Sequence, residues 1–178
     1  PIIFNASEGV KMSNEYCENK IVQQSAADFL EQELGWEVFY AFNNEVIGGS
    51  NSTFGRKSYK EVLLAKRLHA ALKKLNPWIS EDQISEVKKK LEEHLASASP
   101  LDINEEKYRL LLNGMKMNYT DADGAPQENV VRFFDFSNPL HNDFLALQEF
   151  KAQGATYMRR ADIVGVVNGI PLLFRSEE

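Results

Sequence analysis

The segment from Gly154 to Phe174 constrains the fold more than any other part of the chain. It reads GATYMRRADIVGVVNGIPLLF, with apolar and β-branched runs on both sides of Asn168-Gly169. An Asn-Gly pair between two such runs predicts a β-hairpin. Asp162 is an acid at the start of the first run, directly after Arg159, Arg160 and an alanine. A carboxylate on an apolar strand is costly unless it is paired, hydrogen-bonded or bound to a cation, so Asp162 needs a specific explanation.

The remaining sequence predicts alternating helices and strands. Apolar periodicity favours helices over residues 15–34, 58–75, 80–95 and 105–113, and strands over residues 36–42, 115–119 and 129–136. A capping box, Ser80 with Gln83, begins the third helix. Residues 121–124 are expected to form a polar turn, and residues 143–152 fit a strand or a helix. The order predicts one α/β (α+β) domain over residues 1–178, with a mixed sheet flanked by helices.

Composition excludes several classes of protein. The single cysteine, Cys17, excludes a disulfide framework and a cysteine-based zinc site. No stretch approaches the roughly 18 apolar residues that span a bilayer, so we expect a cytoplasmic protein without a membrane partner. The net charge of −6 argues against a free-standing, sequence-independent DNA binder, which normally carries a basic face. It leaves room for an enzyme that meets DNA through other domains or subunits.

Asp162 is the best candidate for chemistry, because no phosphate-binding loop or nucleophile–base pair is found and the three histidines follow no ligand spacing. The residues leave two explanations open: a salt bridge to Arg159 or Arg160, or a divalent cation. A hard divalent ion needs several oxygen ligands, so the second arm of the hairpin, which continues into Arg175-Ser176-Glu177-Glu178, would have to supply the others.

Several short motifs keep the order and spacing of one known family. They are Leu34-Gly35-Trp36-Glu37, Phe54-Gly55-Arg56-Lys57-Ser58-Tyr59, Leu72 to Pro77, Asn104 to Gly114, Asp135 to Pro139 with Asn142-Asp143-Phe144, Arg159 to Val164, and Asn168 to Leu172. From about residue 18 to residue 174, the chain resembles the N-terminal nuclease domain of the restriction (R) subunit of type I restriction-modification enzymes.

The resemblance implies a restriction-endonuclease-like PD-(D/E)xK fold and Mg²⁺-dependent cleavage of double-stranded DNA. Asp162 would be catalytic and bind the metal, and Glu18 on the first helix would assist. Arg159, Arg160 and Arg56 would contact DNA. Implied partners are the modification and specificity subunits and C-terminal motor domains, which alone would use ATP and which this sequence does not contain. The alternative is a non-catalytic, nuclease-like docking module for partner subunits.

The chain departs from the family after Phe174. The family's Glu-x-Lys would fall near Ser176 and Glu178, and neither residue fits. The motif is therefore cut off, missing or lost; we favour missing residues, and expect the chain as it stands not to cut DNA. For Asp162 and position 176 to share a face, the turn would need an odd number of residues. We therefore expect a three-residue loop, Val167 to Gly169, with a bulge and a positive φ at Gly169, which pairs residue 166 with residue 170.

Overall fold

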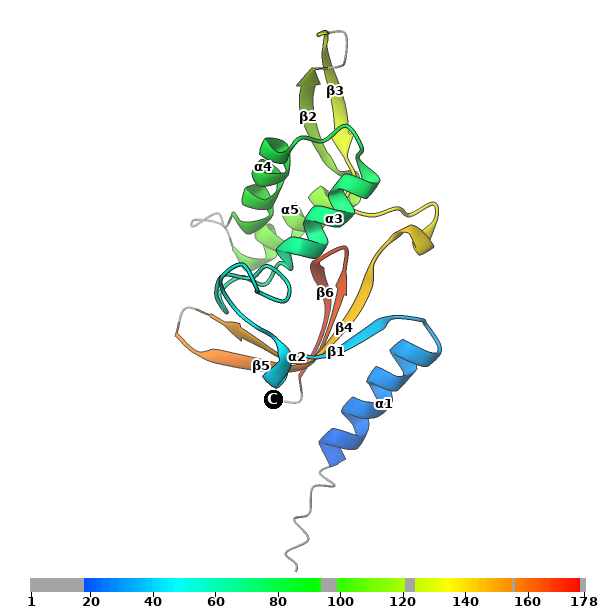
Figure 1. Cartoon of the computed structure of the whole chain (residues 1–178), viewed down its shortest axis with the longest axis vertical. Helices are drawn as coiled ribbons and strands as arrows, with labels where there is room; N and C mark the ends of the chain where they lie inside the picture. The colour runs from blue at the N-terminus through cyan, green and yellow to red at the C-terminus, as the bar shows by residue number, and fades with distance from the viewer. Residues whose placement is uncertain (1–17, 94–98, 121–123, 155, 177–178) are drawn as a thin grey trace, which may run out of the picture.

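The computed structural model describes residues 18–93, 99–120, 124–154 and 156–176 (Figure 1). Its helices are α1 (Glu18–Gln32), α2 (Ala41–Asn44), α3 (Ala65–Leu75), α4 (Glu81–Glu92) and α5 (Pro100–Asn113), with a 3₁₀ turn at Pro139–His141. Its strands are β1 (Glu37–Tyr40), β2 (Met115–Thr120), β3 (Pro126–Val131), β4 (Phe144–Gln153), β5 (Met158–Val167) and β6 (Ile170–Arg175). The expected α/β class is confirmed.

A four-stranded mixed sheet and a separate hairpin make up the β-structure. The larger sheet has the strand order β1-β4-β5-β6, with β1 parallel to β4 and the other neighbours antiparallel. Strands β2 and β3 form the two-stranded sheet. In Figure 1 this hairpin stands at one end of the molecule beside α3, α4 and α5, while α1 and α2 lie beside the larger sheet. The sequence had predicted one sheet, and the second pair is an addition.

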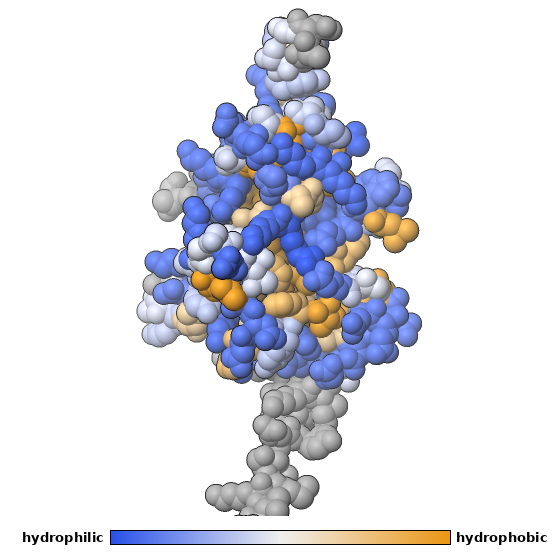
Figure 2. All heavy atoms as spheres, viewed as in Figure 1, coloured by the Kyte–Doolittle hydropathy of each residue, from blue (hydrophilic) through white to orange (hydrophobic). Residues whose placement is uncertain are grey.

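Two hydrophobic clusters hold these parts together. One cluster joins α3, α4 and the two-stranded sheet, and it includes the first residue of β6, Ile170. The other packs the larger sheet against α2 and the loop after it, through residues such as Phe54, Leu147 and Val164. Apolar residues also remain exposed over the larger sheet, between the levels of α3 and α1 in Figure 2. The β5–β6 hairpin therefore belongs to both clusters.

The tip of the β5–β6 hairpin docks against the start of α3. The amide of Leu64 donates to the Gly169 carbonyl at 2.9 Å. Asn168 is 1% exposed, and its side chain accepts from the Asp143 amide (2.7 Å) and donates to the Phe133 carbonyl (2.8 Å). A polar side chain this deeply buried is stabilised only when its groups are paired, and here both ends of the amide are bonded.

Several expected element boundaries were wrong, each for a local reason. The helix expected from residue 58 begins at Ala65, because the carbonyls of Tyr59 and Glu61 accept bonds from a buried arginine instead. The strand expected over 129–136 ends at Val131, because the next amide, that of Arg132, donates to the Asn76 side chain instead of to a neighbouring strand. The strand expected to reach residue 42 gives way to α2 at Ala41, and α5 begins at Pro100 behind a capping box at Ser99.

Other expectations were confirmed. The capping box of Ser80 and Gln83 begins α4, and residues 143–152, which the sequence left undecided, lie mostly in strand β4. The expected turn at residues 121–124 lies mainly outside the described residues. These outcomes leave the larger sheet with β4 and β5 as its two long central strands, and Asp162 lies on the second of them.

Candidate active site

The turn between β5 and β6 differs from the expected one. Val167 pairs with Ile170, so the loop has two residues, and both have positive φ: 52° at Asn168 and 81° at Gly169. Positive φ at both central residues is the type I′ pattern. The three-residue loop was therefore wrong, although the positive φ of Gly169 is confirmed. Asparagine tolerates the left-handed conformation, and the buried bonds of Asn168 hold it there.

A bulge further along β6 restores the alignment that the loop was expected to give. Val166 pairs with Pro171, but Gly165 pairs with Leu173, so Leu172 is an extra residue in β6. Beyond the bulge Ile163 pairs with Arg175, and continuing this register by one residue sets Asp162 opposite Ser176. Directly opposed residues of an antiparallel pair share a face of the sheet. Position 176, where the family motif would place its glutamate, therefore shares the face of Asp162.

Helix α1 lies against the sheet next to Asp162. The side-chain amide of Gln23 donates to the Asp162 carbonyl at 2.7 Å, and the Asp162 side chain is half-buried. Glu18, the acid expected to assist, is the first residue of α1, and its side chain lies outside what the structure describes. Its catalytic role stays a prediction. Gln23 of α1 does reach the strand, and no motif in the sequence indicated it.

The described residues do not by themselves complete a magnesium site. Within residues 18–93, 99–120, 124–154 and 156–176, no group of three or more histidine, cysteine, aspartate or glutamate side chains is placed to hold a metal ion. Asp162 offers one carboxylate, whereas Mg²⁺ requires six ligands. Glu177 and Glu178 lie outside the described residues. Magnesium binding at Asp162 therefore stays a prediction.

Arginines gather beside this position. Arg159, Arg160 and Arg175 line a hollow of about 330 Å³ together with Phe174 and Ser176. Arg159 and Arg160 are exposed, as a DNA-binding role would require. The sequence had left open a salt bridge from Asp162 to one of these arginines; the Arg160 Nε lies 2.7 Å from the carboxylate of Glu149, which the sequence reading had not considered. Arg175 was also missed, because it follows the last apolar residue of the hairpin.

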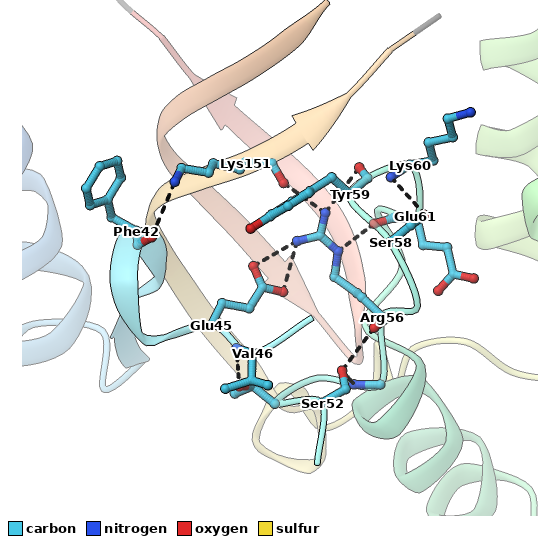
Figure 3. Close-up of polar contacts among 12 residues, drawn as sticks. Phe42, Glu45, Val46, Ser52, Arg56, Ser58, Tyr59, Lys60, Glu61 and Lys151 are labelled. Atoms are coloured by element: carbon cyan, nitrogen blue, oxygen red, sulfur yellow. Dashed lines mark hydrogen bonds and ion pairs between the residues drawn. The ribbon is translucent and has the colours of Figure 1, made fainter. Parts of the chain in front are cut away.

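Arg56 occupies a different environment from the other two arginines (Figure 3). It is 0% exposed, and its guanidinium donates to both carboxylate oxygens of Glu45 at 2.9 Å and to the Lys151 carbonyl at 2.8 Å. Its Cζ lies 4.2 Å from the centre of the Phe150 ring. Burial raises the pKa of Glu45, and the neighbouring Arg56 opposes that rise. The expected DNA contact finds no support here, because Arg56 joins the loop after α2 to β4 and presents no surface to a phosphate.

Known proteins resemble this chain over most of its length. The family model described as the N terminus of type I restriction enzyme R proteins matches residues 15–174. The chain belongs to this family. It is 32% identical, over 149 residues and 80% of its length, to the type I restriction enzyme HindI endonuclease subunit of Haemophilus influenzae. It is 28% identical, over 171 residues and 93% of its length, to a protein of Methanocaldococcus jannaschii named as a candidate type I restriction enzyme MjaIXP endonuclease subunit.

This R-protein domain is a small part of its relatives. The chain spans 13% of the Haemophilus protein and 15% of the Methanocaldococcus protein. The family match includes Asp162, Arg159 and Arg160 and ends at Phe174. The mixed sheet with flanking helices is consistent with a restriction-endonuclease-like fold. Within the described residues, no helix is both long enough and apolar enough to cross a bilayer.

Proposed function

We propose that this chain is the DNA-cleaving domain of a type I restriction enzyme, acting on double-stranded DNA in the cytoplasm as part of host defence. The observation that carries the proposal is the register of β5 and β6. Continued by one residue past the observed Ile163–Arg175 pair, the register beyond the bulge at Leu172 would put Asp162 and position 176 on one face, which is where two carboxylates of a shared cation site would have to lie.

The charge distribution near Asp162 supports a DNA substrate. The chain carries a net charge of −6, yet three arginines line the hollow beside Ser176. Arginine side chains bind backbone phosphates without reading sequence. Arg159 and Arg160 would hold the phosphodiester near Asp162, while the choice of DNA sequence would rest with a separate specificity subunit. The modification subunit and the motor part of a longer R subunit are the other partners that this function implies.

Rebuilding the family motif tests the proposal directly. The double variant Ser176→Glu/Glu178→Lys supplies the expected glutamate opposite Asp162 and the lysine two residues later. We expect it to nick or linearise supercoiled plasmid when Mg²⁺ is added, and to do so faster than the unaltered chain. Adding Asp162→Ala to the double variant should abolish that activity.

The matched control is Ser176→Gln/Glu178→Lys, which has the same side-chain size and lacks the carboxylate. Equal cleavage by this control would show that the second carboxylate is not involved. A folded, DNA-binding double variant that shows no Mg²⁺-dependent cleavage, or whose cleavage survives Asp162→Ala, would refute the assignment of Asp162. Circular dichroism confirms that each variant is folded.

The second candidate function is a nuclease-like docking module without catalytic activity. It is favoured by one observation: the described residues provide no group of three metal-binding side chains. A docking module predicts that the rebuilt motif gains no cleavage and that the unaltered chain still associates with the modification and specificity subunits. The same motif-rebuilding experiment therefore separates the two candidates.

A further inference from the structure

A second hollow lies next to the first on the β4–β5 side of the sheet. It has a volume of about 470 Å³ and is lined by Phe42, Lys151, Tyr157, Met158, Arg159 and Arg160. Arg159 and Arg160 line both hollows, so the two hollows adjoin at these arginines. The second hollow brings α2, β4 and β5 together, and Phe42 lies 109 residues before Lys151 in the sequence.

The ring of Phe42 holds two of these cations in place. The Lys151 Nζ lies 4.1 Å from the ring centre and 3.5 Å from the Phe42 carbonyl oxygen, to which it donates. The Arg160 Cζ lies 5.6 Å from the same ring centre. A cation within about 6 Å of an aromatic face is attracted to it. Phe42 therefore brings Lys151 and Arg160 close to one ring despite their mutual repulsion.

Glu149 is a second residue that holds Arg160. Its carboxylate lies 2.7 Å from the Arg160 Nε, and the Glu149 side chain is only 13% exposed, whereas that of Arg160 is 52% exposed. The contact uses Nε, so the arginine is fixed by a buried carboxylate while half of its side chain still faces solvent. A charge-assisted bond of this kind restricts a flexible side chain to one orientation.

The backbone at Glu149 is unusual. Among the described residues, only Glu149 (φ 56°) and Asn168 (φ 52°) have positive φ without being glycine. The left-handed conformation costs a residue with a Cβ about 1–2 kcal/mol. Buried hydrogen bonds hold Asn168 in this conformation. At Glu149 the corresponding contact is the ion pair with Arg160. Glycine would fit the backbone better but could not hold the arginine.

We propose that Glu149 and Phe42 are positioning residues that fix Arg160 and Lys151 as a preformed binding site for the phosphates of the DNA backbone. This inference rests on the proposed function, because it assumes that DNA is the ligand. A fixed guanidinium loses less freedom on binding than a mobile one, so preorganisation raises affinity. The site would act on any sequence, since it meets only the backbone.

A purely electrostatic role and a positioning role of Glu149 predict opposite effects of Glu149→Gln on DNA affinity. The variant removes a negative charge that lies against Arg160, so a purely electrostatic role predicts tighter DNA binding. A positioning role predicts weaker binding, because the amide holds Arg160 less firmly. We expect the dissociation constant of the 178-residue chain for a fluorescent duplex to rise about three- to tenfold. We also expect its salt dependence to become shallower, as it should for Arg160→Ala.

The control is Glu128→Gln on the β2–β3 hairpin. Glu128 pairs with Lys116 at 3.2 Å, so this variant also removes a carboxylate from an ion pair, but in the other sheet. It should leave DNA affinity unchanged. Phe42→Leu, which keeps an apolar side chain and removes the aromatic face, should weaken binding in the same direction as Glu149→Gln.

Two further results decide the inference. Glu149→Gly relieves the positive φ, so it should fold at least as stably as the unaltered chain while binding DNA more weakly. If Glu149→Gln and Glu149→Gly bind as tightly as the unaltered chain, the positioning role is overturned and the proposed function stands. If the unaltered chain binds no DNA even at low salt, the inference fails, while the proposed function is judged separately by the motif-rebuilding experiment.

Discussion

Replacing Arg56 with methionine should strongly destabilise the domain. The variant leaves the Glu45 carboxylate, whose side chain is 3% exposed, without its cation. It also removes the donors to the carbonyls of Glu61 (2.6 Å), Lys151 (2.8 Å) and Tyr59 (3.3 Å). Removing one partner of a buried ion pair costs about 3–5 kcal/mol, because the remaining charge is buried and uncompensated. That is a large share of the roughly 5–15 kcal/mol that stabilises a typical domain.

The loss should depend on pH in a defined direction. Burial raises the pKa of Glu45, and removing Arg56 takes away the interaction that opposes this rise. In the variant the folded state therefore binds a proton more tightly than the unfolded state, whose glutamate pKa is about 4.3. Stability then falls as the pH rises from that value through the raised folded-state pKa. The defect should be smallest in acid and largest at neutral pH.

Urea unfolding followed by circular dichroism measures the effect. The double variant Arg56→Met/Glu45→Met should recover at least about 2 kcal/mol relative to Arg56→Met, because it removes the buried charge as well. Lys57→Ala, at an exposed neighbouring position, should change stability by less than about 0.5 kcal/mol. A loss below about 1 kcal/mol for Arg56→Met, or no recovery in the double variant, would refute the buried ion pair. If the folded double variant bound DNA much more weakly, Arg56 would be a DNA contact after all.

Two other variants test the hairpin tip and the 135–142 loop. Gly169→Ala should cost about 2–5 kcal/mol by urea unfolding, because φ is positive and the added Cβ would clash with the Leu68 amide nitrogen. Gly49→Ala, with positive φ but nothing within 4 Å of the added Cβ, should cost only about 1–2 kcal/mol. The Asn138 amide and the His141 ring lower the pKa of Asp135, so its stabilisation is present above its unfolded pKa and is lost as the pH falls through the lower folded pKa. Asp135→Asn should therefore show a shallower decrease of melting temperature in acid, and an unchanged acid profile would contradict the assignment.

Local sequence determined the hairpin and its unusual acid. Asn168-Gly169 between two β-branched runs defines the turn, because only residues that tolerate positive φ can form it. The capping box at Ser80 is likewise a local arrangement, since its two partners are three residues apart. That Asp162 and position 176 should share a face is what the resemblance to the restriction-subunit family implies, and residue counting along the two strands shows which turns or bulges satisfy it.

The means by which that requirement is met depended on the tertiary structure. The bulge lies at Leu172 and not at the turn, because Asn168 and Gly169 are fixed by Asp143, Phe133 and the start of α3, which lie far away in the sequence. Because these distant partners fix Asn168 and Gly169, the turn cannot widen into the three-residue loop that the sequence predicted.

The roles of the charged residues were decided in the same way. Arg56 and Arg160 look alike in sequence, but one is buried against Glu45 and the other lies half-exposed beside Glu149. The positive φ of Glu149 has no local sequence signature, because glutamate does not favour it. Sequence alone determined the hairpin and the need for a partner at Asp162. Only long-range packing decided where the bulge lies and which arginines face solvent, because burial depends on segments brought together by the whole fold.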